Sequence, residues 1–447
     1  MLENLKLAVK RQKKLILIFC LTIFIPSISL SVFGIRAIRN ERFRLAEQVE
    51  NENRRVAENL KSQISSYLEE LGSILLSLAQ SNTFEQKSVA GLRDILDEEL
   101  AGNTLVDQVF VAYKGEEPLF PLFQPEPFVV PSSYESGSEG MLQERLKRAE
   151  NYEFNQKDYT SAASLYRNLF DWSKNTNFKA RMLTNMARCS MKAEDYKGAI
   201  RNYKRIRDDY PKSLSSTGLP LALISQLQMA SCYHELGESQ TSLQTFFDLY
   251  RDILTLQWPL KEAQFKIYAA LVGDSIREGV PKNIPGASLD EYKKDYDRLK
   301  TLHQEGLEQW AVVEHIRKEI VPDLLARQNT QAFSSACLQY QKTINTQNYL
   351  ILAVHIPDSL ENRPVGLLGI KINEPYLIEY VIPKVIESIP FSHPSQVVIS
   401  HLSGKILLGE KNLSTEPPTS TEFFEDSFPP WRIDIFPSEE RLQAHSI

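Results

Sequence analysis

The first apolar feature of the chain is a run of 21 residues without charge, from Leu15 to Ile35. At about 1.5 Å per residue, a helix of that length crosses the roughly 30 Å hydrocarbon core of a bilayer. A cleaved signal peptide or a buried core helix would give a similar run. Because the apolar residues lead directly into a helical pattern, we favour an uncleaved transmembrane helix at 15–35.

Basic residues flank this span on both sides. Five Lys and Arg lie in residues 1–14 against one acid, whereas four Arg follow the span, interleaved with Glu41 and Glu47. Under the positive-inside rule the richer flank stays in the cytoplasm. We therefore expect a single-pass protein of the inner cell membrane, with 1–14 as a cytoplasmic tail and the bulk of the chain outside the cytoplasm.

The pattern after the span is typical of one long helix. Apolar residues recur at three- and four-residue steps from Leu45 to Leu78, and neither Pro nor Gly interrupts them before Gly72. The stripe fits a helix packed on its own domain, and it equally fits a stalk that forms a homodimer. A second helix and a strand, Val106–Tyr113, follow, so 36–130 is expected to hold the long helix and a first α/β segment.

An internal repeat begins further along the chain, where residues 155–169 align with 192–206 at an offset of 37. The matched positions are Asp158, Tyr159, Ala162 and Tyr166 in the first copy, and Asp195, Tyr196, Ala199 and Tyr203 in the second. A third copy follows at an offset of 43, with Gly237, Ser242 and Phe246 at equivalent positions. The pattern resembles the tetratricopeptide repeat, in which small residues let paired helices approach and an aromatic ring fills the space beside them. The resemblance covers about 143–256, and further helices extend the predicted array over 141–335.

After about residue 345 the apolar residues alternate with a period of two, which predicts strands. The expected order is strand, strand, helix, hairpin and strand, at 349–355, 365–372, 375–388, 396–408 and 431–436. This order resembles the PAS-like, Cache-type sensory modules of bacterial receptors. We therefore expect 345–447 to form one such module, an antiparallel sheet with a helix.

The parts together predict an α+β multidomain chain, which resembles the extracytoplasmic input region of a bacterial sensor histidine kinase. The sequence departs from that family in lacking its catalytic parts. His234-Glu235-Leu236 is followed by Gly237 instead of the family's Arg-Thr-Pro, and no Gly-rich ATP-binding box occurs. We therefore expect no kinase domain in this chain.

The charge balance and the absence of known motifs argue against nucleic-acid binding and catalysis. The chain has 51 Lys and Arg against 57 Asp and Glu, a net charge of −6, and no long basic block, so nucleic acid is not an expected partner. Its four cysteines include no Cys-x-x-Cys pair, and motifs for phosphate binding, zinc or a nucleophilic serine are absent. We expect no enzyme activity, no catalytic residue, no cofactor and no metal.

The resemblance to tetratricopeptide arrays implies a concave groove lined by the first helix of each repeat. The groove positions it implies are Lys147 and Asn151 in the first repeat and Arg188 and Lys192 in the second. Lys147 and Asn151 resemble part of the set with which some repeats hold a peptide carboxylate, since Lys, Arg and Asn all supply N–H donors. Solvated helix faces would also account for these residues. The groove is the predicted site for a protein or peptide partner.

A second candidate site lies in the C-terminal module. Tyr376 and Tyr380 are four residues apart and so share one helix face, and Arg363 precedes them in a loop. The three residues fit an aromatic cage with a cationic clamp for a small-molecule ligand. They also fit a helix that packs its aromatic rings on the sheet.

Two functions follow from this organisation. The first is a membrane-anchored extracytoplasmic sensory or signal-transduction protein that binds a ligand or a partner protein. The alternative is a membrane-tethered adaptor that recruits proteins for envelope assembly or secretion. In the receptors resembled, a second apolar helix follows the sensory module, so the first function predicts that this chain is the input half of a receptor or an incomplete product.

Overall fold

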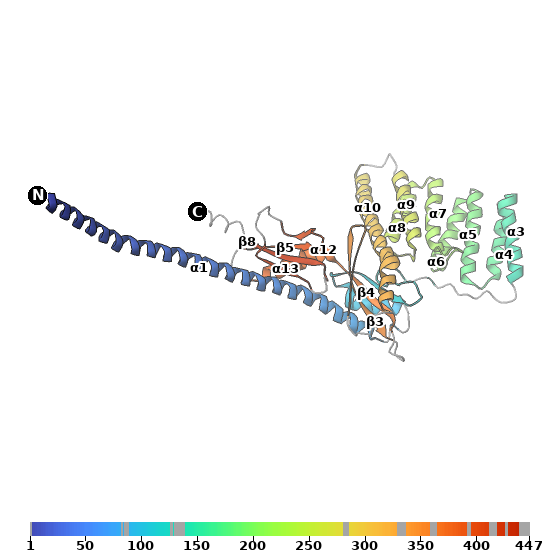
Figure 1. Ribbon diagram of the computed structural model, residues 1–447. Coiled ribbons are helices and arrows are strands. Elements are labelled where there is room, and N and C mark those ends of the chain that lie inside the picture. Colours follow the sequence, from blue (N-terminus) through green and yellow to red (C-terminus); the bar gives the residue numbers. More distant parts are fainter. Residues whose placement is uncertain are drawn as a thin grey trace.

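The computed structural model describes residues 2–81, 84, 89–125, 128, 139–279, 286–328, 337–357, 364–390, 395–410, 418–424 and 428–437. Figure 1 shows three parts in a row. A long helix carries the N-terminus, two sheets lie along the far half of that helix, and an array of helix pairs stands beyond the sheets.

The long helix α1 (Leu2–Ala79) runs for 78 residues without a break and includes the long helix expected from the pattern between Leu45 and Leu78. Apart from Tyr67, its exposed large hydrophobic side chains lie before Val49, for example Leu30 and Phe43, which are 78% and 72% exposed. From Ala57 onward one face is buried against the sheets, as expected for a helix packed on its own domain. The buried stripe consists of Ala57, Leu60, Ile64, Leu68, Leu71 and Leu75.

Residues 15–35 lie within α1, but the side chains of residues 2–26 are outside the described set. Within the part of the chain that is described, none of the helices combines the length and the apolar character needed to cross a membrane.

Two antiparallel four-stranded sheets form the middle of the molecule. The first has the order β1-β4-β3-β2 and the second β6-β5-β8-β7. The strands of the first are β1 (Val106–Tyr113), β2 (Leu338–Ile344), β3 (Gln347–Pro357) and β4 (Pro364–Ile372). Those of the second are β5 (Ser395–His401), β6 (Ile406–Leu408), β7 (Ser420–Phe423) and β8 (Trp431–Pro437).

This topology differs from the single C-terminal sheet expected at 345–447. That segment divides between the two sheets, and β1, which precedes the helical array, pairs with β4, which follows it. The helical array is therefore an insertion between β1 and β2 of the first sheet. Along the chain, a short helical segment connects β4 of the first sheet to β5 of the second. It consists of α12 (Glu374–Tyr376), the π-helical segment η5 (Leu377–Val381) and α13 (Ile382–Ser388).

The array consists of antiparallel helix pairs. The first pair is α3 (Glu139–Glu150), continued by the π-helical segment η3 (Asn151–Gln156), with α4 (Tyr159–Trp172). The next pairs are α5 (Thr176–Lys192) with α6 (Tyr196–Asp209), and α7 (Leu221–Glu235) with α8 (Ser239–Leu254). Then come α9 (Glu262–Gly279) and α10 (Gly286–His315), which continues through η4 (Ile316–Ile320) to α11 (Val321–Gln328). Two shorter elements, α2 (Val89–Leu96) and η2 (Asp97–Ala101), precede β1.

The turn inside each of the first three pairs explains the sequence repeat. A residue with positive φ stands there each time, Lys157, Glu194 or Gly237. In the first two pairs the next residue is the repeated Asp, which caps the second helix. Asp158 accepts a hydrogen bond from the Ser161 amide at 3.0 Å, and Asp195 accepts one from Gly198 at 2.9 Å. The repeated Ala162, Tyr166, Ala199 and Tyr203 are buried, whereas the repeated Tyr159 and Tyr196 are half-buried.

The first sheet is covered on both faces. On β1, Val109 and Val111 join the hydrophobic core shared with α1, whereas Phe110 and Ala112 join the core shared with α8, α9 and α10. The Phe110 ring lies against Gly369 on β4, where an added Cβ would overlap the ring. The sheet is thus packed between the long helix and the end of the array.

Candidate partner-binding groove

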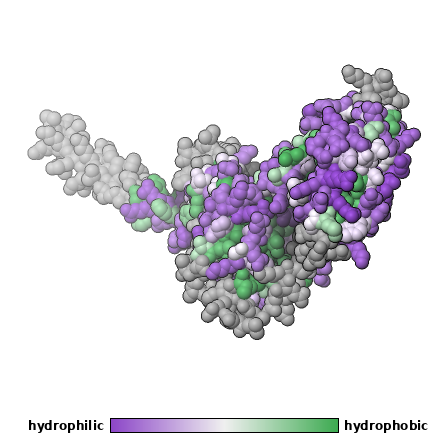
Figure 2. All heavy atoms as spheres, turned by 90° about the vertical axis from the view of Figure 1, so that its right-hand side faces the viewer, coloured by the Kyte–Doolittle hydropathy of each residue, from purple (hydrophilic) through white to green (hydrophobic). Residues whose placement is uncertain are grey.

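The first helices of three successive pairs, α3 with η3, α5 and α7, line a groove of about 600 Å³. Its walls combine apolar side chains with charged and amide groups. They include Leu146, Phe154, Arg181, Asn185, Ile224 and Gln228. In the view of Figure 2 the array surface is mostly hydrophilic, with apolar patches between the polar side chains. A concave surface that extends over three helix pairs and mixes apolar with polar groups suits a peptide segment.

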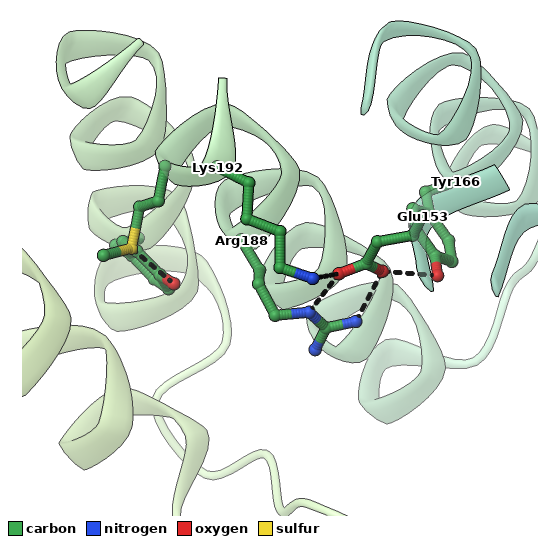
Figure 3. A network of polar contacts seen from close by, with 6 residues as sticks. Glu153, Tyr166, Arg188 and Lys192 are labelled. Carbon is green, nitrogen blue, oxygen red and sulfur yellow. Dashed lines mark hydrogen bonds and ion pairs between the residues drawn. The ribbon is translucent and has the colours of Figure 1, made fainter. Parts of the chain in front are cut away.

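A buried carboxylate organises one end of the groove (Figure 3). The side chain of Glu153, on η3, has no exposed surface and accepts hydrogen bonds from three neighbours. Arg188 donates from Nε to Oε1 at 2.5 Å and from Nη2 to Oε2 at 2.7 Å. Lys192 donates to Oε1 at 2.9 Å, and the Tyr166 hydroxyl donates to Oε2 at 2.9 Å. Glu153 therefore ties the first pair of helices to the second.

The charges of this cluster explain why a buried acid stays ionised. Burial opposes ionisation of Glu153, but hydrogen bonds from Arg188 and Lys192 outweigh it and hold the pKa of Glu153 below its usual range. Burial, and then the bond to Glu153, raises the pKa of Tyr166, which keeps its hydroxyl as a donor. The cluster is a fixed structural unit with both of its cations partly neutralised.

Phe154 places an aromatic ring beside these cations. Its side chain is 54% exposed although it is large and apolar. The guanidinium of Arg188 lies 5.2 Å from the ring centroid and the ammonium of Lys192 lies 4.4 Å from it. Such cation–π contacts hold the ring in place at the groove surface. Phe154 is therefore an apolar contact surface that is ordered before any partner arrives.

The four predicted groove residues do not all come together. Arg188 and Lys192 line the groove, but both form ion pairs with the buried Glu153. Lys147 and Asn151 are exposed and are not among the described residues that line it, and Asn151 accepts a hydrogen bond from Asn155 at 2.7 Å. The structure thus shows two predicted cations at the groove and an internal acid between them.

Sequence reasoning missed two features of the groove. Glu153 lies 35 residues before Arg188, so no local spacing marks it as a partner. Arg181 and Asn185 were detectable, because they precede Arg188 by seven and three residues and so share its helix face. Among the described residues, Arg181 has no ion-pair partner, which leaves its charge available at the groove.

The second predicted site is described only in part. Arg363 lies outside the described residues. Tyr376 and Tyr380 share one helix face as the spacing predicted, and their rings stack with centroids 5.1 Å apart and planes 21° apart. Tyr376 packs partly against the core, whereas Tyr380 is 55% exposed. A role of this pair in binding a ligand stays a prediction.

Comparisons with known proteins bear on the array. Residues 182–213, which run from within α5 to just past α6, match the tetratricopeptide repeat family. No curated protein matches the sequence. Among solved structures, the chain is similar to the Hsp90 co-chaperone Cns1 from Saccharomyces cerevisiae (delta69), with 12% identity and a TM-score of 0.20, over 63% of this chain and 85% of that one.

The family match confirms a tetratricopeptide repeat at the second helix pair. It supports protein–protein interaction as the role of the array, because such repeats present extended concave surfaces to partners. The resemblance of the sheets to a PAS or Cache module stays a prediction.

Proposed function

We propose that this protein is a membrane-anchored sensory or signal-transduction protein that binds a segment of a partner protein in the groove of its helical array. The observation that carries the proposal is the groove itself, with its ordered Phe154 ring and the cation of Arg181 on a tetratricopeptide-like frame. The chemistry favours a segment that offers an apolar side chain to the ring and an acidic group to Arg181.

The packing of the first sheet supports a signalling role. The end of the array, at α10 and η4, shares a hydrophobic core with one face of this sheet, and α1 covers the other face. Close-packed cores transmit small displacements instead of absorbing them. A displacement of the array on partner binding can therefore be transmitted through the first sheet to the long helix.

The second sheet also contacts α1, at Asn53. Asn53 on α1 donates to the Thr419 hydroxyl at 2.8 Å and accepts from Ser395 at 3.4 Å. Because Ser395 pairs with Pro437, β8 ends near Asn53. The end of β8 thus lies beside α1 at Asn53, closer to the N-terminal anchor than the first sheet does, which suits a coupling between the second sheet and the long helix.

The membrane anchor is part of this proposal. It is supported by the uncharged run at 15–35 and by the exposed apolar side chains that continue along α1, such as Phe33 and Ile35. With this run in the inner membrane, the array would stand at the far end of the molecule from the bilayer (Figure 1). That position suits a partner met outside the cytoplasm.

Affinity purification of the full chain from native membranes tests the proposal. Arg181→Glu reverses the available charge in the groove, and Lys204→Glu makes the same change on the exposed side of α6. We expect a partner protein that is recovered with the wild type and with Lys204→Glu, and lost with Arg181→Glu. Equal recovery of all partners with both variants would contradict the proposal.

The adaptor function is the second candidate, because the groove alone suffices for it. Hydrogen exchange separates the two. A sensor predicts that partner binding changes amide protection in α1 around Asn53, whereas an adaptor predicts changes confined to the array.

A further inference from the structure

A second cavity, of about 520 Å³, lies between the first sheet and helix α10. Asp107 and Gln108 on β1 and Gln347 on β3 form the sheet side. Glu305, Glu308 and Val312 on α10 form the helix side. Its volume falls in the range of small-molecule sites, roughly 300–1,000 Å³. It is separate from the groove, which is lined by α3, η3, α5 and α7.

The sheet side of this cavity carries an amide group that no described side chain engages. Gln108 is only 7% exposed, and its side chain has no hydrogen-bond partner among the described residues. A bulge at Asp107 interrupts the register between β1 and β4, and Gln108 pairs with Lys371. Gln108 lines the cavity, and its amide is not among the fully enclosed groups without a partner, so its small exposed surface opens to the cavity. The amide can therefore donate to and accept from a bound ligand.

A chain of hydrogen bonds orients the second amide, that of Gln347. The Tyr349 hydroxyl donates to Oε1 of Gln347 at 3.1 Å, and Nδ1 of His315 lies 2.6 Å from the same hydroxyl. Burial raises the pKa of Tyr349 to about 12, so this hydroxyl stays protonated and donates. With its oxygen engaged, Gln347 has its N–H groups left for the cavity.

The charges around the cavity are mainly negative. Asp107 forms an ion pair with Lys371, which is buried and also faces the Tyr349 ring at 5.6 Å, so these two charges cancel. Glu305 and Glu308 are exposed and have no basic partner among the described residues. Glu308 accepts a neutral hydrogen bond from Gln304 at 3.0 Å. Two uncompensated carboxylates therefore face two amides across the cavity.

We propose that this cavity binds a small organic cation, a molecule with an amine or guanidinium group that pairs with Glu305 and Glu308 and a hydrogen-bonding group that reaches Gln108. Such a ligand would sit where the array meets the sheet. The proposal does not depend on partner binding in the groove.

Titration calorimetry on the full chain in neutral detergent tests this site, with L-arginine, agmatine and spermidine as probes. Citrulline, the uncharged analogue of arginine, is the ligand control at matched ionic strength. We expect at least one cation to bind, with citrulline at least tenfold weaker than arginine if arginine is that cation. Failure of all three cations to bind, or binding of citrulline as tight as that of arginine, would overturn the proposal.

Variants locate the binding. The double change Glu305→Gln and Glu308→Gln alters only exposed side chains, so the fold is retained, and we expect the dissociation constant of the bound cation to rise at least tenfold. Asp295→Asn removes an exposed acid from the same helix, away from the cavity, and should leave the constant unchanged. Equal affinity of the double variant and the wild type would place the cation elsewhere and contradict the proposal.

Discussion

Glu153→Gln tests the cluster that joins the first two helix pairs. The change keeps the size of the side chain but removes its charge, which leaves Arg188 and Lys192 without their counter-ion. Breaking a fully buried ion pair costs about 3–5 kcal/mol. Here 36% of the Arg188 side chain and 33% of the Lys192 side chain are exposed, so water takes over part of the lost interaction. We therefore expect a loss of about 2 kcal/mol in local stability.

Hydrogen exchange followed by mass spectrometry measures this loss where it occurs. A change of about 2 kcal/mol lowers amide protection in α4 and α5 by about 30-fold. Glu150→Gln is the matched control, because Glu150 lines the same groove and makes no ion pair among the described residues. If Glu153→Gln loses no more protection than Glu150→Gln, the cluster does not hold the helix pairs together and our reasoning is wrong.

The same cluster predicts a pH dependence. The pKa of Glu153 is lower in the folded protein than its ordinary value of 4.5. The stability that its charge contributes is therefore present above pH 4.5 and is lost as the pH falls through the lower, folded-state value. We expect the difference in protection between wild type and Glu153→Gln to be constant from neutral pH down to about 5 and to shrink below 4.5. A difference that grows under acid would contradict this assignment.

Three further predictions concern the repeat, the sheet and the topology. Ala199→Trp should lower the thermal stability of the array by about 1–3 kcal/mol or more, because Ala199 is fully buried between helices; unchanged melting would contradict the repeat alignment. Gly369→Ala should cost a similar amount, since its Cβ would overlap the buried Phe110 ring, and melting equal to wild type would refute the contact between them. A cysteine at the exposed Gln240 should react with a membrane-impermeant maleimide in intact cells, and reaction only after lysis would reverse the proposed topology.

The sequence contained enough information to predict the helix pairs. The repeated Asp158 and Asp195 make the same capping bond in both pairs, and the repeated Tyr166 and Tyr203 are both buried. Each of these contacts is made within one pair or between neighbours in the chain. A contact between residues close in the chain requires a fixed spacing in the sequence, so the repeat could be detected from its offset of 37 residues.

The sheet arrangement was not predictable in the same way. Alternation identifies a strand but not its neighbour, and the pairing of Val111 with Leu368 joins residues on either side of the whole array. A segment that seemed to hold one sheet therefore divides between two. The groove shows the same limit, because Arg188 looked like a free cation until Glu153, far away in sequence, proved to be its partner.

Photo-crosslinking in living cells tests the central claim most directly. A benzoylphenylalanine at Thr184, within the groove, reports on a bound segment, and the same residue at the exposed Arg201 on α6 is the control. We predict a discrete crosslinked protein from position 184 that is absent from position 201 and is lost when Arg181→Glu is added. The same crosslinks from both positions, or crosslinks at 184 that Arg181→Glu leaves unchanged, would contradict partner binding in this groove.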